Sequence, residues 1–148
     1  MWAGIAAGAV ARAQAYIRHV MRQSGGQAPP GATQFGQAQA SLRTLRALLA
    51  SGLASYQARM QDPKALAAMD FQSMITLTKV EASELAVSIV MRAMRVCGLA
   101  GYRCDHEFSV ERHLRDVLSS PIMINNERIL GNLASTLLVS PVPASLTD

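Results

Sequence analysis

Apolar and small side chains recur every three or four residues from Trp2 to Val20, which is the period of an amphipathic α-helix. The pattern stops at SGGQAPPG, residues 24–31, because glycines and a Pro-Pro pair prevent a helix from continuing. A second stripe of the same period runs from Leu42 to Met60. Two long helices separated by a loop are therefore predicted for this half of the chain.

A third long helix is predicted to start at Asp62-Pro63 or at Asp70 and to reach about Cys97. Aspartate accepts backbone N–H bonds at a helix start, and proline needs no such bond in the first turn. Apolar side chains occupy two sides of this helix, so we expect it to lie between neighbours. The glycines that follow Cys97 are expected to end it, as left-handed or close-approach positions.

Two shorter helices are predicted in the last third of the chain. The first is expected to begin at Ser109 and to be broken by Pro121. The second is expected to be capped by Asn125 or Asn126 and to continue through Leu137, since leucines recur there every three or four residues.

The composition agrees with a helical fold. Only 5% of the residues are aromatic, and good helix formers dominate over the residue types that favour strands. We therefore predict an all-α protein, an up-down bundle of three long and two shorter helices over residues 1–140, followed by an irregular tail at 141–148.

Charge is distributed unevenly along the chain, whose net charge is +4. The first acidic residue is Asp62, and six arginines precede it. Such a basic half either faces phosphates, of a nucleotide cofactor, coenzyme A or nucleic acid, or is a solvated helix surface. The arginines form no tight run and are not interleaved with aromatic residues, so nucleic acid is not expected as a partner.

The two cysteines, Cys97 and Cys104, form no C-x-x-C pair, so neither a disulfide framework nor a zinc site is predicted. Reduced thiols favour a cytoplasmic protein. Residues 1–13 are interpreted as part of the fold rather than as a signal peptide, because no basic segment precedes the apolar part. No uninterrupted apolar run of membrane-spanning length is found, so no membrane is expected as a partner.

Three motifs occur in a fixed order: KVEASELA at 79–86, RVCGLAGY at 95–102 and FSVERHLRD at 108–116. They resemble the K-x-x-A-S-E-x-A, Q-x-x-G-G-x-G-[YF] and [YF]-P-V-E-R-x-x-R-D motifs of the C-terminal helical domain of the acyl-CoA dehydrogenase family. IAAGAVARAQA at 5–15 is similar to that domain's first helix. The resemblance covers roughly residues 1–138.

The resemblance implies that the glycine turn lies against the FAD of a neighbouring subunit. Arg95 stands where the family has an FAD-contacting glutamine, and Gly98 matches the first glycine of the turn. Leu99 replaces the second glycine, and a leucine side chain there would crowd a close contact between the backbone and FAD. The alternative is a glycine that caps the helix and binds no ligand.

The family's catalytic glutamate removes the α-proton of an acyl thioester and stands in a Y-E-G-T motif, whose counterpart here is the segment 123–126. Ile124 takes the place of that glutamate and cannot accept a proton. Some members carry the base on the first helix, at about Met1 here, where no acidic residue is present. Glu127 is the nearest carboxylate and is interpreted as a charge at a helix start rather than as a displaced base.

No catalytic residue and no set of metal ligands is predicted. By the resemblance, Asn126 occupies the position of a flavin-contacting threonine, and we expect the Asn125-Asn126 pair, with Arg128 beside it, to line the flavin edge. His106 lies between two carboxylates, and is interpreted as part of an exposed loop rather than as a metal ligand.

The resemblance thus implies the C-terminal domain of an FAD-dependent oxidoreductase that acts on an acyl thioester of coenzyme A or a carrier protein. The reaction is either acyl thioester oxidation or, since Ile124 replaces the glutamate, flavin-dependent monooxygenation. The family's other two domains have no counterpart in this sequence, so we do not expect activity from the chain alone. The expected partner is a second copy in a homo-oligomer, or a chain supplying those domains.

Two functions of other classes remain as alternatives. One is a non-catalytic helical scaffold for oligomerisation, which would use apolar helix faces. The other is a basic nucleic-acid binder, whose affinity would fall steeply with salt.

Overall fold

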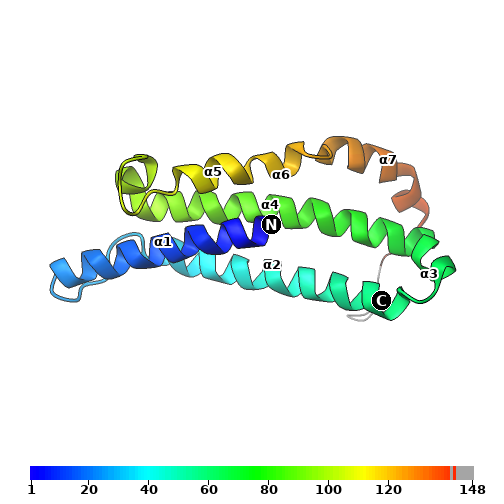
Figure 1. Cartoon of the computed structure of the whole chain (residues 1–148), viewed down its shortest axis with the longest axis horizontal. Coiled ribbons are helices and arrows are strands. Elements are labelled where there is room, and N and C mark those ends of the chain that lie inside the picture. Colours follow the sequence, from blue (N-terminus) through cyan, green and yellow to red (C-terminus); the bar gives the residue numbers. More distant parts are fainter. Residues whose placement is uncertain (141, 143–148) are drawn as a thin grey trace.

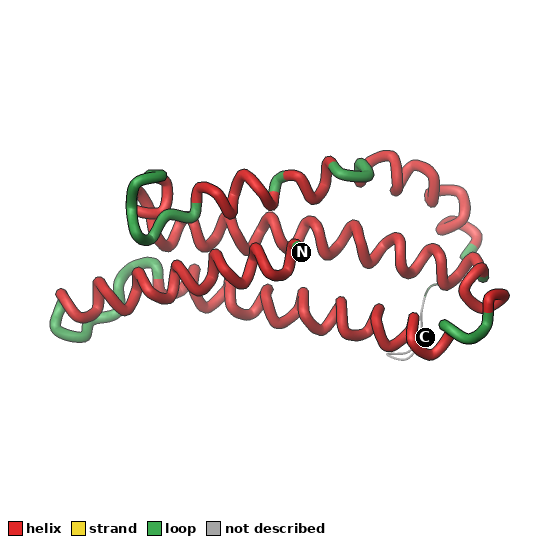
Figure 2. The backbone as a smooth tube through the Cα atoms, in the orientation of Figure 1, coloured by secondary structure: helices red, strands yellow, loops and turns green. Residues whose placement is uncertain are grey.

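The computed structural model describes residues 1–140 and 142, and within them every regular element is a helix (Figure 2). The helices follow one another along the chain as α1 (Trp2–Gln23), α2 (Ala32–Arg59), α3 (Pro63–Ala67), α4 (Met69–Tyr102), α5 (Glu111–Val117), α6 (Ser119–Ile122) and α7 (Asn126–Val139).

Three long helices form the body of an up-down bundle (Figure 1). The central helix α4 packs most extensively against α1 and α2. α1 covers only part of the length of the other two, because it begins near the middle of the bundle (Figure 1). The short helices α5, α6 and α7 follow one another along α4 as a fourth, broken column.

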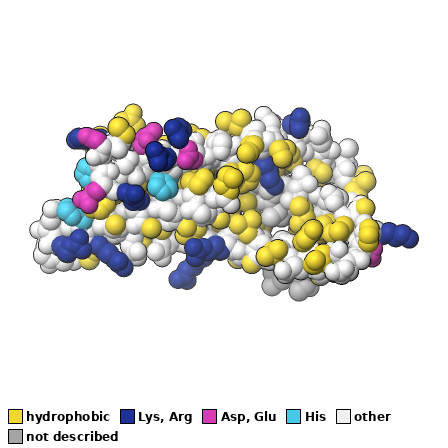
Figure 3. Space-filling model, viewed as in Figure 1, with side chains coloured by type: hydrophobic (Ala, Val, Ile, Leu, Met, Phe, Trp, Pro, Cys, Tyr) yellow, Lys and Arg dark blue, Asp and Glu magenta, His cyan; other side chains and the backbone are white. Residues whose placement is uncertain are grey.

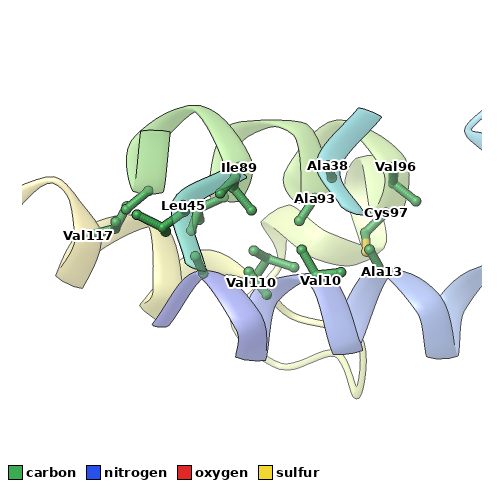
Figure 4. Packing of buried hydrophobic residues seen from close by; sticks show 14 of the residues in the cluster. Val10, Ala13, Ala38, Leu45, Ile89, Ala93, Val96, Cys97, Val110 and Val117 are labelled. Carbon is green, nitrogen blue, oxygen red and sulfur yellow. The ribbon is translucent and has the colours of Figure 1, made fainter. Parts of the chain in front are cut away.

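Small side chains build much of the core between the long helices. The fully buried alanines are Ala6, Ala9, Ala13, Ala38, Ala86 and Ala93. Because alanine occupies little space, the helices approach closely, and larger side chains such as Leu45 and Ile89 fill the layers between them (Figure 4). Truncation of Ile89 to alanine would leave a cavity and cost about 2–5 kcal/mol.

The apolar character of α4 follows from its central position. Its most apolar window has a mean hydropathy of 1.4, and 44% of that window is buried within the bundle. By length and composition alone this helix would also be able to cross a membrane. The helix at the centre of a bundle has the same composition, since neighbours cover more than one of its sides.

Both candidate starts of the third long helix lie at helix N-termini, but only one of them is a cap. The Asp62 side chain accepts hydrogen bonds from the backbone N–H groups of Lys64 and Ala65, and so caps the short helix α3. Asp70 lies in the first turn of α4, where a negative charge is favourable. The long helix itself begins at Met69.

The expected end of the third helix near Cys97 is wrong in one respect. Gly98 does take a left-handed φ of 55°, but helical structure resumes after this kink and continues to Tyr102. Gly101 is the close-approach glycine, because a Cβ there would lie 2.5 Å from the Cβ of Cys97. The helix is therefore kinked at the first glycine and not ended by it.

Pro121 does not break the helix it was expected to break. It lies inside α6, within the first turn, where backbone N–H groups have no intrahelical partner to lose. α5 has already ended at Val117. The first of the two predicted shorter helices is thus divided into two pieces.

The all-α bundle is confirmed. Its three long helices are α1, α2 and α4, and α7 is the last of the shorter helices that the leucine spacing predicts. The predicted tail at 141–148 lies outside the described residues apart from Val142, which is exposed.

Candidate functional site

The turn at Gly98 is open on its outer side. Its φ of 55° and ψ of −137° are available to glycine and are strongly disfavoured for residues with a Cβ. A Cβ added at Gly98 would meet nothing within 4 Å. The backbone conformation, and not packing inside this chain, therefore requires a glycine here.

Leu99 and Arg95 lie beside this turn and are both exposed. Leu99 is 80% exposed, so its side chain does not close the turn from within the chain. Arg95 lies one turn of helix before Gly98, on the exposed side of α4. Their predicted contacts with FAD remain predictions.

The N-terminus of α2 lies next to the same end of α4. A Cβ at Gly31 would lie 3.4 Å from the Cα and the carbonyl oxygen of Val96. No side chain caps this helix start, and the Ala32 N–H donates to the Pro29 carbonyl oxygen, which leaves the N–H groups of Thr33 and Gln34 for other acceptors. A helix N-terminus with free N–H groups favours an anion.

Three polar side chains near this helix start were not singled out from the sequence. Arg92 on α4 donates a hydrogen bond to the side-chain oxygen of Gln37 on α2. Two further atoms, Arg92 Nε and Gln34 Oε1, are buried without a hydrogen-bond partner within the chain. The sequence signal that could have identified Arg92 is its spacing, because it lies three residues before Arg95 on the same helix, directly before the glycine turn.

The second region is the turn between α6 and α7, where the family carries its glutamate. Ile124 has a φ of 57° and is 63% exposed. Lys79 on α4 donates hydrogen bonds to the Ile124 carbonyl oxygen at 2.7 Å and to Asn126 Oδ1 at 2.6 Å. Burial lowers the pKa of Lys79, and the neighbouring charge of Glu84 raises it in part.

Asn126 was predicted to line the flavin edge, and the structure places it in the interior. It is 7% exposed, and its amide nitrogen donates to Ser83 Oγ at 2.9 Å and to Glu84 Oε1 at 2.7 Å. Together with Lys79, these contacts use both ends of the amide. The polar residues of the K-x-x-A-S-E-x-A motif thus converge on one asparagine.

The other residues proposed near this turn are exposed. Arg128 and Glu127 both lie in the first turn of α7, as expected for the carboxylate of a helix start. Asn125 is the cap, since its side chain accepts the N–H of Arg128 at 3.1 Å.

An apolar pocket of about 260 Å³ lies next to this second turn. Its lining consists of Met1, Trp2, Ala3, Leu45, Leu49, Ala82 and Met123. Met1 and Met123, the residue directly before Ile124, thus line the same pocket. The lining has no acidic side chain, so the pocket offers an apolar group space and no proton acceptor.

The glycine turn and the pocket lie far apart along one helix. Ala82, in the pocket wall, and Gly98 are separated by about 24 Å at the rise of an α-helix. One chain therefore presents two separate surfaces, which we call the Gly98 turn and the Ile124 turn.

The histidines belong to neither surface. His113 packs over Gly8, and burial lowers its pKa, as does the charge of Arg12. The His106 ring is 5.5 Å from the Phe108 ring, and its Nδ1 accepts the N–H of Phe108. Within the described residues, no group of three or more His, Cys, Asp or Glu side chains is arranged to hold a metal ion.

Most basic side chains are exposed and spread over the surface (Figure 3). Within the part of the chain that the structure describes, the ion pairs are Arg103 with Asp105 and Arg115 with Asp116. Carboxylates among the described residues therefore do not neutralise the arginines of α1 and α2.

The fold defines the class of the protein, an antiparallel helical bundle domain. Residues 1–134 match the family model described as "Acyl-CoA dehydrogenase, C-terminal domain". The chain belongs to the acyl-CoA dehydrogenase family, and the matched residues correspond to the C-terminal domain of its members. No curated protein and no solved structure matches it.

Proposed function

We propose that this chain forms the helical part of an FAD site in an oxidoreductase that acts on acyl thioesters. The observation that carries the proposal is the open Gly98 turn, whose conformation requires glycine although no atom of the described residues fills the space beside it. Bare backbone permits the close approach of a large planar or phosphorylated ligand.

The groups around the Gly98 turn fit a dinucleotide. Arg95 is free to pair with a phosphate, and the uncapped N-terminus of α2 adds backbone donors. When bound, FAD would supply the redox chemistry, by accepting a hydride or, in its reduced form, by activating oxygen.

The Ile124 turn favours a reaction without removal of an α-proton. The pocket beside it is lined by apolar side chains and by no carboxylate, so it suits the chain of an acyl group. Flavin-dependent monooxygenation requires no proton acceptor at residue 124 and agrees better with isoleucine than acyl thioester oxidation does.

The distance between the two turns supports an assembly with a second polypeptide. A cofactor held at the Gly98 turn would lie about 24 Å along α4 from the pocket on the same chain. We expect the remaining groups from a second polypeptide, either another copy or one that carries the family's other two domains. The acyl group arrives on coenzyme A or on a carrier protein, and we place the assembly in the cytoplasm.

The test is FAD binding by the purified chain, followed through flavin fluorescence. Arg95→Ala should weaken binding about tenfold, the effect expected when one charge-assisted hydrogen bond is lost. Arg43→Ala, on the exposed side of α2, is the matched control and should leave the affinity unchanged. Equal weakening by both variants would show a diffuse charge effect and would contradict the proposed site.

A non-catalytic scaffold is the second candidate, because an apolar stripe on α2 is exposed. Leu49, Leu53, Tyr56 and Met60 share this stripe and are 40%, 57%, 47% and 49% exposed, respectively. Apolar side chains gather on this end of the bundle in Figure 3. A colourless oligomer that binds no FAD and dissociates on Leu53→Glu would favour the scaffold over the enzyme.

A further inference from the structure

The Ile124 turn holds an isoleucine in a conformation that isoleucine rarely adopts. Ile124 is the one non-glycine residue with a positive φ in the described part of the chain. Left-handed φ values are disfavoured for L-residues, and most of all for β-branched ones. Because the side chain is 63% exposed, packing does little to compensate.

Side chains of α4 hold this turn in place. Lys79 Nζ lies 2.7 Å from the Ile124 carbonyl oxygen and 2.6 Å from Asn126 Oδ1. Between the described residues of this turn and α4, no backbone–backbone hydrogen bond is formed. The hydrogen bonds that join this turn to α4 therefore come from side chains, and the bond from Lys79 is the one that reaches the Ile124 carbonyl itself.

The same lysine borders the apolar pocket. Lys79 Nζ lies 5.7 Å from the centroid of the Trp2 ring, and Trp2 lines the pocket. Met123, which directly precedes Ile124 and is far from Trp2 in the sequence, also lines the pocket. Lys79 thus contacts one pocket residue directly and reaches another through the turn.

We infer that Lys79 is a positioning residue, which fixes the left-handed turn at Ile124 and thereby sets where Met123 bounds the pocket. A substitution of Lys79 should change the shape of the pocket even where the bundle remains folded. The inference rests on the proposed function only in that the pocket is taken to receive an acyl chain.

The binding experiment uses decanoic acid as the probe and the fluorescence of Trp2, the single tryptophan, as the signal. Lys79→Met keeps the length of the side chain and removes its donors. It should weaken decanoate binding about fivefold or more, while circular dichroism shows a folded bundle. Lys64→Met is the matched control, because Lys64 is the other lysine and lies exposed on α3. It should leave the affinity unchanged.

A rescue variant separates positioning from general stabilisation. Glycine adopts a positive φ without strain, so Ile124→Gly in the Lys79→Met background should restore the affinity to within about twofold of the unsubstituted chain. Lys79→Arg keeps donors and should lose less affinity than Lys79→Met. A double variant that binds as weakly as Lys79→Met would overturn the inference, as would a Lys79→Met chain with unchanged affinity.

Hydrogen exchange distinguishes this inference from the proposed function. If the unsubstituted chain does not bind decanoate, the acyl pocket is wrong, but the turn can still be tested. Lys79→Met should then speed amide exchange about tenfold at Arg128 and Ile129, whose N–H groups are hydrogen-bonded to Asn125, and Ile124→Gly should reverse the change. Unchanged exchange would contradict the role of Lys79. If Lys79→Met does not fold, Lys79→Gln, which is too short to reach both acceptors, replaces it in both measurements.

Discussion

Gly98 and Ile124 have almost the same φ, 55° and 57°, and the chain accommodates them in different ways. At Gly98 the residue type removes the strain, and in the part of the chain that the structure describes no neighbour would contact a Cβ at this position. At Ile124 the residue type adds strain, and hydrogen bonds that Lys79 donates to the Ile124 carbonyl oxygen and to Asn126 Oδ1 hold the turn. The first turn is thus determined by one residue, and the second by contacts with another helix.

This difference has a functional meaning. A turn that needs only its own glycine can leave its outer face open for a ligand or another chain. A turn that depends on a network of side chains is fixed in shape, as the wall of a binding pocket must be. The substitutions below test the two kinds of turn against each other, and the free energy of unfolding from urea denaturation is the common measurement.

The largest effect is expected from Asn126→Ala. It removes the amide that pairs with Lys79, Ser83 and Glu84, and it leaves these polar groups partly unsatisfied. We expect a loss of about 3 kcal/mol in the free energy of unfolding. Asn132→Ala, at an exposed position of α7, is the control and should change it by less than about 0.5 kcal/mol. Equal effects of the two variants would show that the network does not hold the turn.

Gly98→Ala should have the next largest effect. A Cβ meets no atom there, so the whole cost comes from the backbone conformation, about 2 kcal/mol. Gly36→Ala is the matched control, because Gly36 lies in α2 with equally open surroundings and an ordinary helical conformation. It should stabilise the chain by about 1 kcal/mol. Changes of the same sign in both variants would contradict the left-handed φ of Gly98.

Ile124→Gly should stabilise the chain slightly. Relief of the left-handed strain gains about 1–2 kcal/mol, and the greater freedom of glycine in the unfolded chain offsets about 0.5–1 kcal/mol of it. We therefore expect a net gain of about 0.5 kcal/mol. Ile122→Gly, two residues earlier and 71% exposed within α6, should instead destabilise the chain.

The smallest effect is a pH dependence of stability that comes from α5, which lies between the two turns in the sequence. Burial lowers the pKa of His113 on α5 from 6.5, with a further lowering by Arg12 and Arg112 and an opposing effect of Asp116. The unfolded chain therefore binds a proton at His113 more tightly than the folded chain does. The contribution of His113 to the free energy of unfolding is fully present above pH 6.5 and is lost as the pH falls toward the lowered pKa. His113→Gln should reduce the loss of stability between about pH 7.5 and about pH 5.5. An unchanged slope would assign the loss to other groups.

Much of the fold followed from local patterns. The stripes of α1 and α2, the loop at 24–31 and the cap at Asp62 are properties of residues close together in sequence. The left-handed conformation of Gly98 was predicted for the same reason, since glycine is the residue that adopts it freely. The predicted helix ends at Cys97 and at Pro121 were wrong, because helical structure resumes after a kink near the first and after a turn before the second.

The candidate site was harder to predict. Its motif positions identified the Gly98 turn and Ile124, but not the strained φ of Ile124, because a β-branched residue carries no signal for it. The sequence did not single out Arg92 and Gln34. Both were noticed because packing leaves one polar atom of each without a hydrogen-bond partner among the described residues, and the sequence does not show this.

By itself, the sequence determined an all-α bundle and membership in the acyl-CoA dehydrogenase family, because helical period and motif order are written in near neighbours. Only the tertiary structure decided that Asn126 faces the interior, bonded to a lysine 47 residues away. It also decided that Trp2 and Met123, from distant parts of the chain, border one pocket. Contacts of this kind depend on how the helices pack, and the period of a helix does not specify which side chains meet across a bundle.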